Sequence, residues 1–249
     1  MIENKIIQKN FYNKHFSKES SRSDACFDAG KKYYLDNFIS SVIRPDSKKV
    51  LEIGCGNGFL TYFILKRPIH LTAIDISEIA IESMKKIFAH EIEQGKLDSK
   101  CADILEFMES TDGKYDAIIG SGIIHHIQKK DWKKLFELAH NKLNHGGIFA
   151  CGPEPNAGGL YAFIWPMAKF FYSLFGIDYD REVEKGTFDM IPRKLKSVLK
   201  EAGFRNPEII PYQVIPHFHL KILEYFGKKI IKHVPGKLSF YIIIKGEKR

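Results

Sequence analysis

The 249-residue sequence predicts an α/β fold with a doubly wound, mostly parallel sheet. From residue 48 onward, short apolar runs alternate with segments of helical pattern, which is typical of parallel strands joined by crossover helices. A glycine-rich turn follows the first of these runs directly. The apolar fraction of 44% is enough for one large core, so one domain with an insertion is the simplest organisation.

The N-terminal residues 1–45 are predicted to form a helical cap. Within them, residues 28–42 have the clearest helical pattern, and Pro45 ends that helix. Residues 46–249 would then form the main domain, with a helical insertion at 156–203. Several prolines and glycines mark the start of this insertion, because such residues interrupt regular structure.

Seven strands are predicted in the main domain. Each is a short apolar run, and the first five alternate with helical segments. The last two strands could extend one edge of the sheet. The expected strands are 49–54, 70–75, 97–102, 115–120, 147–152, 208–212 and 239–245, and the expected helices are 59–66, 77–90, 131–143, 192–202 and 220–232.

The first strand leads into the motif with the most specific chemistry. Gly54, Gly56 and Gly58 alternate with other residues, and a helix starts at Phe59. Glycine allows a sharp turn and lets a ligand approach the backbone without meeting a Cβ atom. The spacing is GxGxG, whereas a dinucleotide-binding turn has GxGxxG. The motif therefore favours the methionine end of a nucleoside ligand over a pyrophosphate, the alternative being glycines that serve only a tight turn.

Acidic residues stand where the neighbouring strands end. Asp75 closes the second strand about twenty residues after the glycine loop, where an acid can accept hydrogen bonds from both ribose hydroxyls. Asp103 follows the third strand, where it could meet an adenine amino group. Ligands of α/β sheets bind at this carboxyl edge. Each acid has an alternative role as the cap of the next helix, and Glu52 could simply satisfy loop amides.

With these motifs, the chain resembles the class I S-adenosylmethionine-dependent methyltransferases over roughly residues 30–155, and we expect the resemblance to continue to the end. Residues 115–119 with the following histidines resemble the fourth-strand motif of the small-molecule branch, and 143–147 resemble the turn into the fifth strand. The resemblance implies a seven-stranded Rossmann-like sheet with an antiparallel edge hairpin, and S-adenosylmethionine as the cofactor. The cofactor-binding residues that it implies are Glu52, Gly54, Gly56, Gly58, Asp75, Ile76, Asp103, Ile104 and Ser121.

His125 and His126 follow the fourth strand, near the place where the methyl group of the cofactor should lie. Methyl transfer from a sulfonium needs mainly alignment, but a nitrogen or oxygen acceptor also loses a proton, which histidine can take near neutral pH. Both histidines are therefore candidate catalytic residues, the alternative being that one merely orders the loop. Glu154 and Asn156, after the fifth strand, could hold the acceptor or fix a turn.

The acceptor is expected to be a small molecule or a lipid-linked compound. Residues 160–177 are rich in aromatic side chains, and residues 181–249 carry 15 Lys and Arg against 7 Asp and Glu, which is the whole net charge of +8. A lipid acceptor with peripheral contact to an anionic membrane would account for both features. The alternatives are a lid over the acceptor pocket, a core-packing insertion or oligomer interface, and a solvated lysine face.

Other classes of function have weaker support in the sequence. An RNA or protein methyltransferase could use the basic C-terminal region, and a non-catalytic protein could bind S-adenosylmethionine alone. We expect no nucleic-acid partner, because no RNA-binding module is recognisable. No signal peptide is expected after Met1, and four scattered cysteines fit a reducing cytoplasm. We therefore expect a cytoplasmic protein without a metal site, which would bind peripherally to a membrane if the acceptor is a lipid. The sequence does not indicate the oligomeric state.

Overall fold

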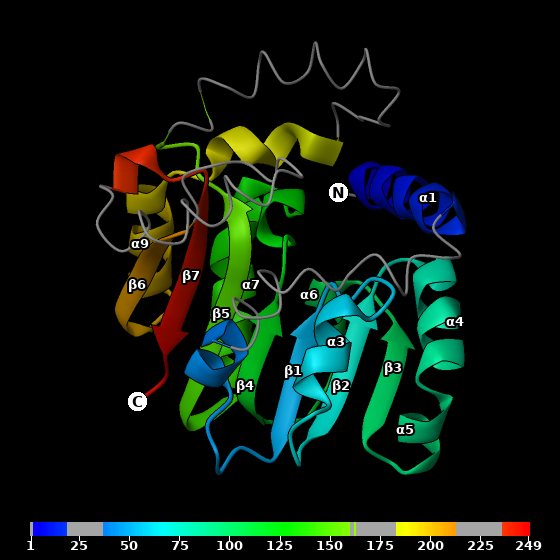
Figure 1. Cartoon of the computed structure of the whole chain (residues 1–249). Helices are drawn as coiled ribbons and strands as arrows, with labels where there is room; N and C mark the ends of the chain where they lie inside the picture. Colours follow the sequence, from blue (N-terminus) through cyan, green and yellow to red (C-terminus); the bar gives the residue numbers. More distant parts are fainter. Residues whose placement is uncertain (1, 19–36, 160–161, 163–182, 213–235) are drawn as a thin grey trace, which may run out of the picture.

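The computed structural model describes residues 2–18, 37–159, 162, 183–212 and 236–249. Within these residues, the strands are β1 Lys49–Ile53, β2 His70–Asp75, β3 Leu97–Cys101, β4 Tyr115–Gly120, β5 Leu143–Pro155, β6 Arg205–Tyr212 and β7 Tyr241–Glu247. They form one seven-stranded sheet in the order β3-β2-β1-β4-β5-β7-β6 (Figure 1). The first five strands are parallel, and β7 runs antiparallel between β5 and β6. The predicted fold class is confirmed.

The helices lie between the strands in the chain and cover both faces of the sheet. The α-helices are α1 Ile2–Lys18, α3 Phe59–Ile64, α4 Glu78–Ile87, α5 Ala89–Glu93, α6 Ile104–Ser110, α7 Trp132–Lys142 and α9 Pro192–Glu201, and the 3-10 helices are η1 Ile124–His126, η2 Lys129–Asp131, η3 Val183–Asp189 and η5 Gly236–Leu238. Residues 37–42 are also helical. Side chains of α3, α4 and this short helix enter one core cluster, whereas those of α6, α7 and α9 enter another.

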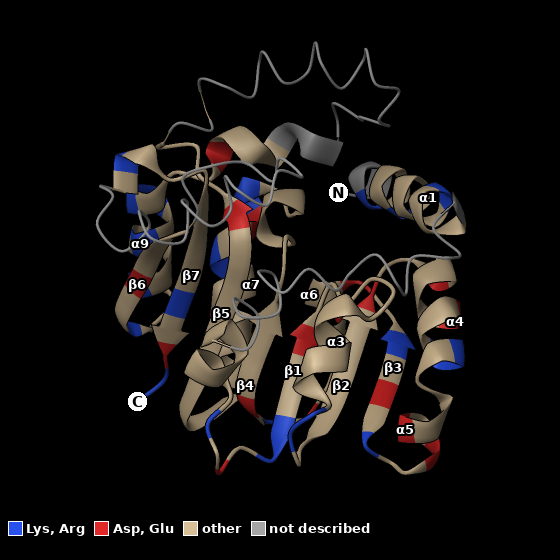
Figure 2. Cartoon of the chain, in the orientation of Figure 1, with Lys and Arg blue, Asp and Glu red and all other residues tan. Residues whose placement is uncertain are grey.

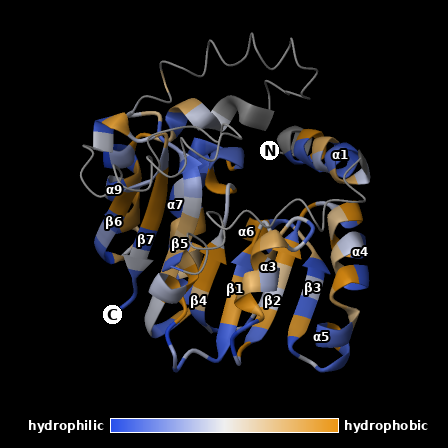
Figure 3. Ribbon diagram, viewed as in Figure 1, coloured by the Kyte–Doolittle hydropathy of each residue, from blue (hydrophilic) through white to orange (hydrophobic). Residues whose placement is uncertain are grey.

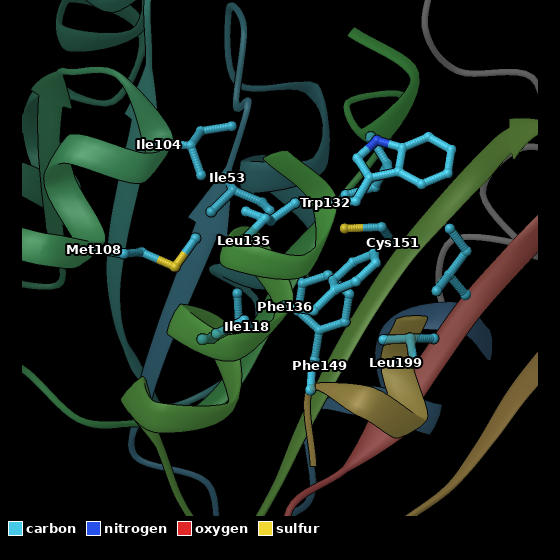
Figure 4. Packing of buried hydrophobic residues seen from close by; sticks show 14 of the residues in the cluster. Ile53, Ile104, Met108, Ile118, Trp132, Leu135, Phe136, Phe149, Cys151 and Leu199 are labelled. Carbon is cyan, nitrogen blue, oxygen red and sulfur yellow. The ribbon is translucent and has the colours of Figure 1, made fainter. Parts of the chain in front are cut away.

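The two core clusters lie on opposite faces of the sheet because residues of a strand alternate between its faces. Figure 3 shows that the central strands are largely hydrophobic. The cluster under α7 is built around large, fully buried side chains, among them Trp132, Phe136 and Phe149 (Figure 4). The indole N–H of Trp132 donates to the carbonyl of Ile127 at 3.0 Å, so this ring is buried without an unpaired polar atom.

Two predicted elements differ from the observed ones for reasons of long-range contact. The expected helix at 77–90 is divided into α4 and α5 at Phe88, which leaves the helical conformation. The ring of Phe88 lies against Gly58, where it would collide with any Cβ atom. The expected strand at 147–152 runs from Leu143 to Pro155, because its pairing with β4 starts earlier and its pairing with β7 continues later.

Helix α1 occupies a different position from the other helices. It lies across the carboxyl edge of the sheet, next to α4, and covers neither face (Figure 1). The division of the chain into a cap at 1–45 and a main domain remains a prediction. The aromatic stretch 160–177, the helix at 220–232 and most of the helix at 28–42 lie outside the described residues, apart from Ala162 and residues 37–42.

Candidate active site

A cavity of about 280 Å³ opens at the carboxyl ends of β1, β2 and β4. Parallel α/β sheets bind ligands at this edge, where the strand order reverses on either side of β1. Helix α1 forms the wall opposite the strands. The lining residues are Lys5, Gln8, Tyr12, Phe16, Glu52, Gly54, Cys55, Gly56, Asn57, Phe59, Leu60, Asp75, Ile76, Asp103, Ile104, Leu105, Ser121, Gly122, Ile123, His126, Ile127, Gln128 and Asp131.

The glycine loop forms the floor of the cavity with backbone atoms. Gly56 has a φ of +52°, which side chains rarely adopt, and a Cβ atom there would lie 3.0 Å from the ring of Phe16. Gly54 lines the cavity as well, and its N–H donates to the carbonyl of Ile74 at 2.9 Å. Gly58 does not line the cavity: with a φ of +93° it is the N-cap of α3. Glycine is required there by this backbone conformation and by the ring of Phe88, which would collide with a Cβ atom.

Asp75 lies at the end of β2 and reaches under the glycine loop. One carboxylate oxygen accepts from the N–H of Gly56 and the other from the N–H of Ser77, both at 2.9 Å. Burial raises the pKa of Asp75, while these backbone bonds oppose the rise. The N-cap of α4 is Ser77, whose hydroxyl accepts from the N–H of Ala80. Asp75 is thus not the helix cap, and it lines the cavity.

Glu52 is the most deeply buried acid of the cavity, with 1% of its surface exposed. The hydroxyl of Thr61 donates to its Oε2 at 2.7 Å. Burial raises the pKa of Glu52 to about 8; the Thr61 bond opposes the rise and the Asp75 carboxylate adds to it. A cation that binds beside such a buried carboxyl group favours its ionised form and so lowers its pKa again.

Asp103 has the capping role and also faces the cavity. Its Oδ1 accepts from the N–H groups of Leu105 and Glu106 at 3.0 and 3.1 Å, which is the geometry of an N-cap. Lys5 of α1 forms an ion pair with the same carboxylate at 3.1 Å. Ile76, Ile104 and Ser121, which the sequence also predicted at the site, line the same cavity.

The two histidines of η1 have different surroundings. His126 lines the cavity, and its Nε2 lies 2.6 Å from the hydroxyl of Tyr12. His125 is not among the lining residues; its Nδ1 lies 2.7 Å from Oε2 of Glu154. Glu154 is fully buried and also accepts from the N–H groups of Ile123 and Ile124 at 2.8 and 2.9 Å. Glu154 therefore holds the turn that carries both histidines.

Asn156 joins β5 to the chain before β7. Its amide nitrogen donates to the carbonyl of Gly236 at 3.0 Å and to the hydroxyl of Ser239 at 2.8 Å, and its oxygen accepts from the N–H of Gly158. The side chain is buried and lies outside the cavity lining. Of the two sequence interpretations of Asn156, these contacts favour the turn.

Four lining residues come from α1, and the sequence did not indicate any of them: Lys5, Gln8, Tyr12 and Phe16. The apolar residues of α1 do not gather on one face of the helix, so no periodic pattern marks a buried side. The only local signal is the density of aromatic rings, since Phe11, Tyr12, His15 and Phe16 contact one another.

The described residues contain no group of three or more His, Cys, Asp or Glu side chains that could hold a metal. Over the same part of the chain, each helix is too short or too polar to cross a bilayer. Cys55 and Cys151 are buried, and burial raises the pKa of both thiols, whereas Cys101 is exposed. Cys26 lies outside the described residues.

Known proteins resemble this chain in sequence and in fold. Residues 50–147 match the family model described as a methyltransferase domain. The malonyl-[acyl-carrier protein] O-methyltransferase of Priestia megaterium is 31% identical over 140 residues, which cover 52% of this chain and 49% of the relative. A ubiquinone biosynthesis O-methyltransferase of Pseudomonas aeruginosa is 25% identical over 70% of this chain and 72% of its own length. The match thus spans about half the length of the first of these relatives.

Solved structures with low sequence identity share the fold. A SAM-dependent methyltransferase from Archaeoglobus fulgidus has a TM-score of 0.61 and 21% identity, covering 87% of this chain and 92% of that one. Magnesium protoporphyrin IX methyltransferase from Synechocystis, solved with bound SAH, has a TM-score of 0.59 and 12% identity over 99% and 100% of the two chains. Identities this low establish the likeness of fold alone.

Proposed function

Because the chain belongs to the class I S-adenosylmethionine-dependent methyltransferases, we propose that it transfers the methyl group of S-adenosylmethionine to an oxygen of a small-molecule or lipid-linked acceptor. The observation that carries the proposal is the cavity at the carboxyl edge, where a glycine backbone floor, four acidic side chains and His126 meet. The choice of oxygen is supported by the two relatives named as O-methyltransferases.

The residues of the cavity fit the cofactor. A Cβ atom at Gly56 would project toward Phe16 of the opposite wall and come within 3.0 Å of its ring; its absence lets a ligand approach the loop backbone. Asp75 has lone pairs for ribose hydroxyls, and Asp103 with Ile104 would hold the adenine side. Glu52 suits the positively charged methionine end, since a cation compensates a buried carboxylate. When bound, S-adenosylmethionine would supply a methyl group on a cationic sulfur. An acceptor lone pair can attack the methyl carbon, and the sulfur is the leaving group.

The rest of the cavity suits an acceptor with an apolar body and a polar reacting group. Ile123, Ile127 and Leu105 supply apolar surface, while Tyr12 and His126 supply polar atoms on the α1 side. Such a mixture is typical of small-molecule sites, in which a few polar groups set the orientation. The chain would align the acceptor oxygen with the methyl group. His126, the histidine that lines the cavity, would then be the final base for the proton that the acceptor loses.

The activity is tested by incubating the chain with methyl-labelled S-adenosylmethionine and a cell extract, followed by mass spectrometry of separated small-molecule, lipid, RNA and protein fractions. We expect the label in the small-molecule or lipid fraction. Label in RNA or protein would contradict the proposed acceptor class. Binding of S-adenosylmethionine without any label transfer would indicate a non-catalytic binding protein.

The cofactor site is tested by a pair of glycine variants. Gly56→Val should lose S-adenosylhomocysteine binding in calorimetry, because the new side chain enters the cavity. Gly95→Val is the matched control: Gly95 has a similarly positive φ of +66° but no atom within 4 Å of a Cβ. Both variants carry the same kind of backbone strain, so only Gly56→Val should affect the ligand. Equal binding by the two folded variants would contradict the assignment.

A further inference from the structure

Adjacent histidines of η1 face different partners. His126 lines the cavity, whereas His125 is directed to Glu154, whose carboxylate is fully buried. The two imidazole rings lie 3.8 Å apart between centroids. Only one of the two can therefore meet a ligand in the cavity as the site stands, and that one is His126.

Helix α1 brings Tyr12 to this histidine from the opposite wall. The hydroxyl of Tyr12 lies 2.6 Å from Nε2 of His126, and the two rings meet edge to face at 5.3 Å. The side-chain amide of Gln8, one turn earlier, donates to the backbone carbonyl of His126. Tyr12, Gln8 and His126 all line the cavity, so the contact forms part of its surface.

The position of α1 does not depend on the histidine contact alone. The hydroxyl of Ser77 donates to the side-chain oxygen of Asn13 at 2.7 Å. Lys9 forms an ion pair with Glu78 at 2.7 Å. These contacts join α1 to the start of α4 through the residue next to Tyr12 and through a residue one turn before it. The hydroxyl of Tyr12 is thus held in place by its helix.

We infer that Tyr12 and His126 form the proton-transfer pair for the acceptor, an inference that rests on the proposed function. The acceptor hydroxyl gives its proton to Oη of Tyr12, while Tyr12 passes its own proton to Nε2 of His126. The oxygen lone pair forms the bond to the methyl carbon, and the electron pair of the broken carbon–sulfur bond stays on sulfur. A tyrosine hydroxyl can serve in this way because it both donates and accepts.

His125 and Glu154 act through this pair as positioning residues. Glu154 accepts from the backbone N–H groups of Ile123 and Ile124 and from the ring of His125. These bonds fix the backbone of η1, and the ring of His125 supports the ring of His126 from behind the cavity wall. General bases need such fixed geometry, because proton transfer requires hydrogen-bond distance.

The experiment compares Tyr12→Phe and His126→Gln with Tyr62→Phe in the full chain. Tyr62 lies on α3, outside the cavity lining, so it controls for loss of a tyrosine hydroxyl. The probe is the small-molecule and lipid fraction of a cell extract, methylated with labelled S-adenosylmethionine over a range of pH. We expect His126→Gln to lose about a hundredfold or more in rate and Tyr12→Phe about tenfold or more, with S-adenosylhomocysteine binding retained within about twofold.

The shape of the pH profile separates a proton-transfer role from packing. The parent rate should rise with pH as the histidine loses its proton, and this limb should shift or disappear in Tyr12→Phe but not in Tyr62→Phe. A Tyr12→Phe variant that keeps the parent limb would overturn the inference, even with a lower rate, because a structural role lowers the rate at every pH alike.

A second measurement keeps the inference separate from the proposed function. The ring resonances of His126, assigned by comparison with His126→Gln, are titrated by nuclear magnetic resonance in the parent and in Tyr12→Phe, without any acceptor. We expect the His126 titration to shift in Tyr12→Phe and to stay in Tyr62→Phe. If the parent transfers no label, the proposed function fails; if the His126 titration does not move, the pair fails.

Discussion

At the scale of one residue, Glu52 shows how a buried acid can favour a cationic ligand in the cavity. Its carboxyl group is buried with one hydroxyl donor, Thr61, and beside a second acid, Asp75. Charging it costs free energy in the ligand-free protein, since burial disfavours ions. A cationic ligand would offset that cost. Ionisation of Glu52, which is unfavourable in the ligand-free protein, would therefore become favourable in the complex.

The free energy of unfolding of the ligand-free protein should therefore decrease as pH rises. The pKa of Glu52 is about 8 in the fold against 4.5 for an ordinary glutamate, so the folded state holds the proton that the unfolded chain has lost. The contribution of Glu52 is complete below the lower value and is lost as pH rises through about 8. Asp75, whose pKa is also raised, acts in the same direction.

Urea unfolding of the parent at about pH 5 and about pH 8 measures this loss. Glu52→Gln keeps the acceptor for Thr61 but cannot ionise, so its stability should depend less on pH. Glu208→Gln, at an exposed site on β6, is the control and should follow the parent. If the free energy of unfolding changed equally between the two pH values in Glu52→Gln and in the parent, the burial argument would be contradicted.

Asp75 should contribute directly to cofactor affinity. Asp75→Ala removes the acceptor proposed for two ribose hydroxyls, at a cost of about 1–3 kcal/mol, which corresponds to roughly tenfold or more in affinity. Asp116→Ala is a matched control, since Asp116 also accepts from two backbone N–H groups but lies at the opposite edge, where β1 begins. Calorimetry with S-adenosylhomocysteine should show the loss only in Asp75→Ala; equal affinity in both would exclude the ribose role.

At the scale of secondary structure, the 3-10 helix η1 depends on a strand far away in the sequence. Glu154 lies near the end of β5, just after its pairing with β7 shifts register between Cys151 and Glu154. Its carboxylate accepts the N–H groups at the start of η1, as a capping residue would do from within the helix. The turn that carries the histidines is thus fixed by tertiary contact.

Glu154→Ala should destabilise the protein, because it leaves the N–H groups of Ile123 and Ile124 buried without their carboxylate. One unsatisfied buried group costs about 1–3 kcal/mol, and a domain of this size loses roughly 2–4 °C in Tm per kcal/mol. We expect a measurable fall in thermal denaturation, with Glu154→Gln intermediate because it keeps one oxygen. Glu208→Ala should change Tm little; a parent-like Tm in Glu154→Ala would contradict the capping role.

At the scale of the whole molecule, positive charge gathers toward the C-terminal part of the chain. Helix α9 is rich in Lys and Arg (Figure 2), and Lys194, Lys196 and Lys200 are exposed there. Near an anionic membrane each such residue contributes about 1 kcal/mol, and salt weakens the attraction. Peripheral membrane contact remains a prediction, because the aromatic stretch 160–177 that would accompany it lies almost wholly outside the described residues.

Sedimentation with vesicles tests this prediction. The parent should sediment with vesicles of anionic lipid more than with neutral ones, and changing Lys194, Lys196 and Lys200 to Gln should reduce that binding. The matched control changes Lys85, Lys86 and Lys96 to Gln, which removes the same charge near the other end of the sheet. If neither vesicle type retains the parent, a soluble small-molecule acceptor becomes the better interpretation.

The sequence by itself determined the layer structure and the strand side of the cavity. Alternating apolar runs mark parallel strands because burial on both faces requires them, and GxGxG marks the loop because its backbone conformation and close approach exclude side chains. Asp75 and Asp103 were predictable for the same reason: the carboxyl ends of neighbouring strands meet at one edge. These features depend on short-range pattern, which a single sequence contains.

Only the tertiary structure decided where α1 and the two histidines lie relative to the cavity. Tyr12 and His126 are 114 positions apart, and no periodic apolar face in α1 indicates that its residues line a cavity. Adjacent histidines look equivalent in the sequence, yet Glu154 from β5 holds one and Tyr12 from α1 meets the other. Contacts of this kind arise when distant elements pack together, so their geometry exists only in the folded chain.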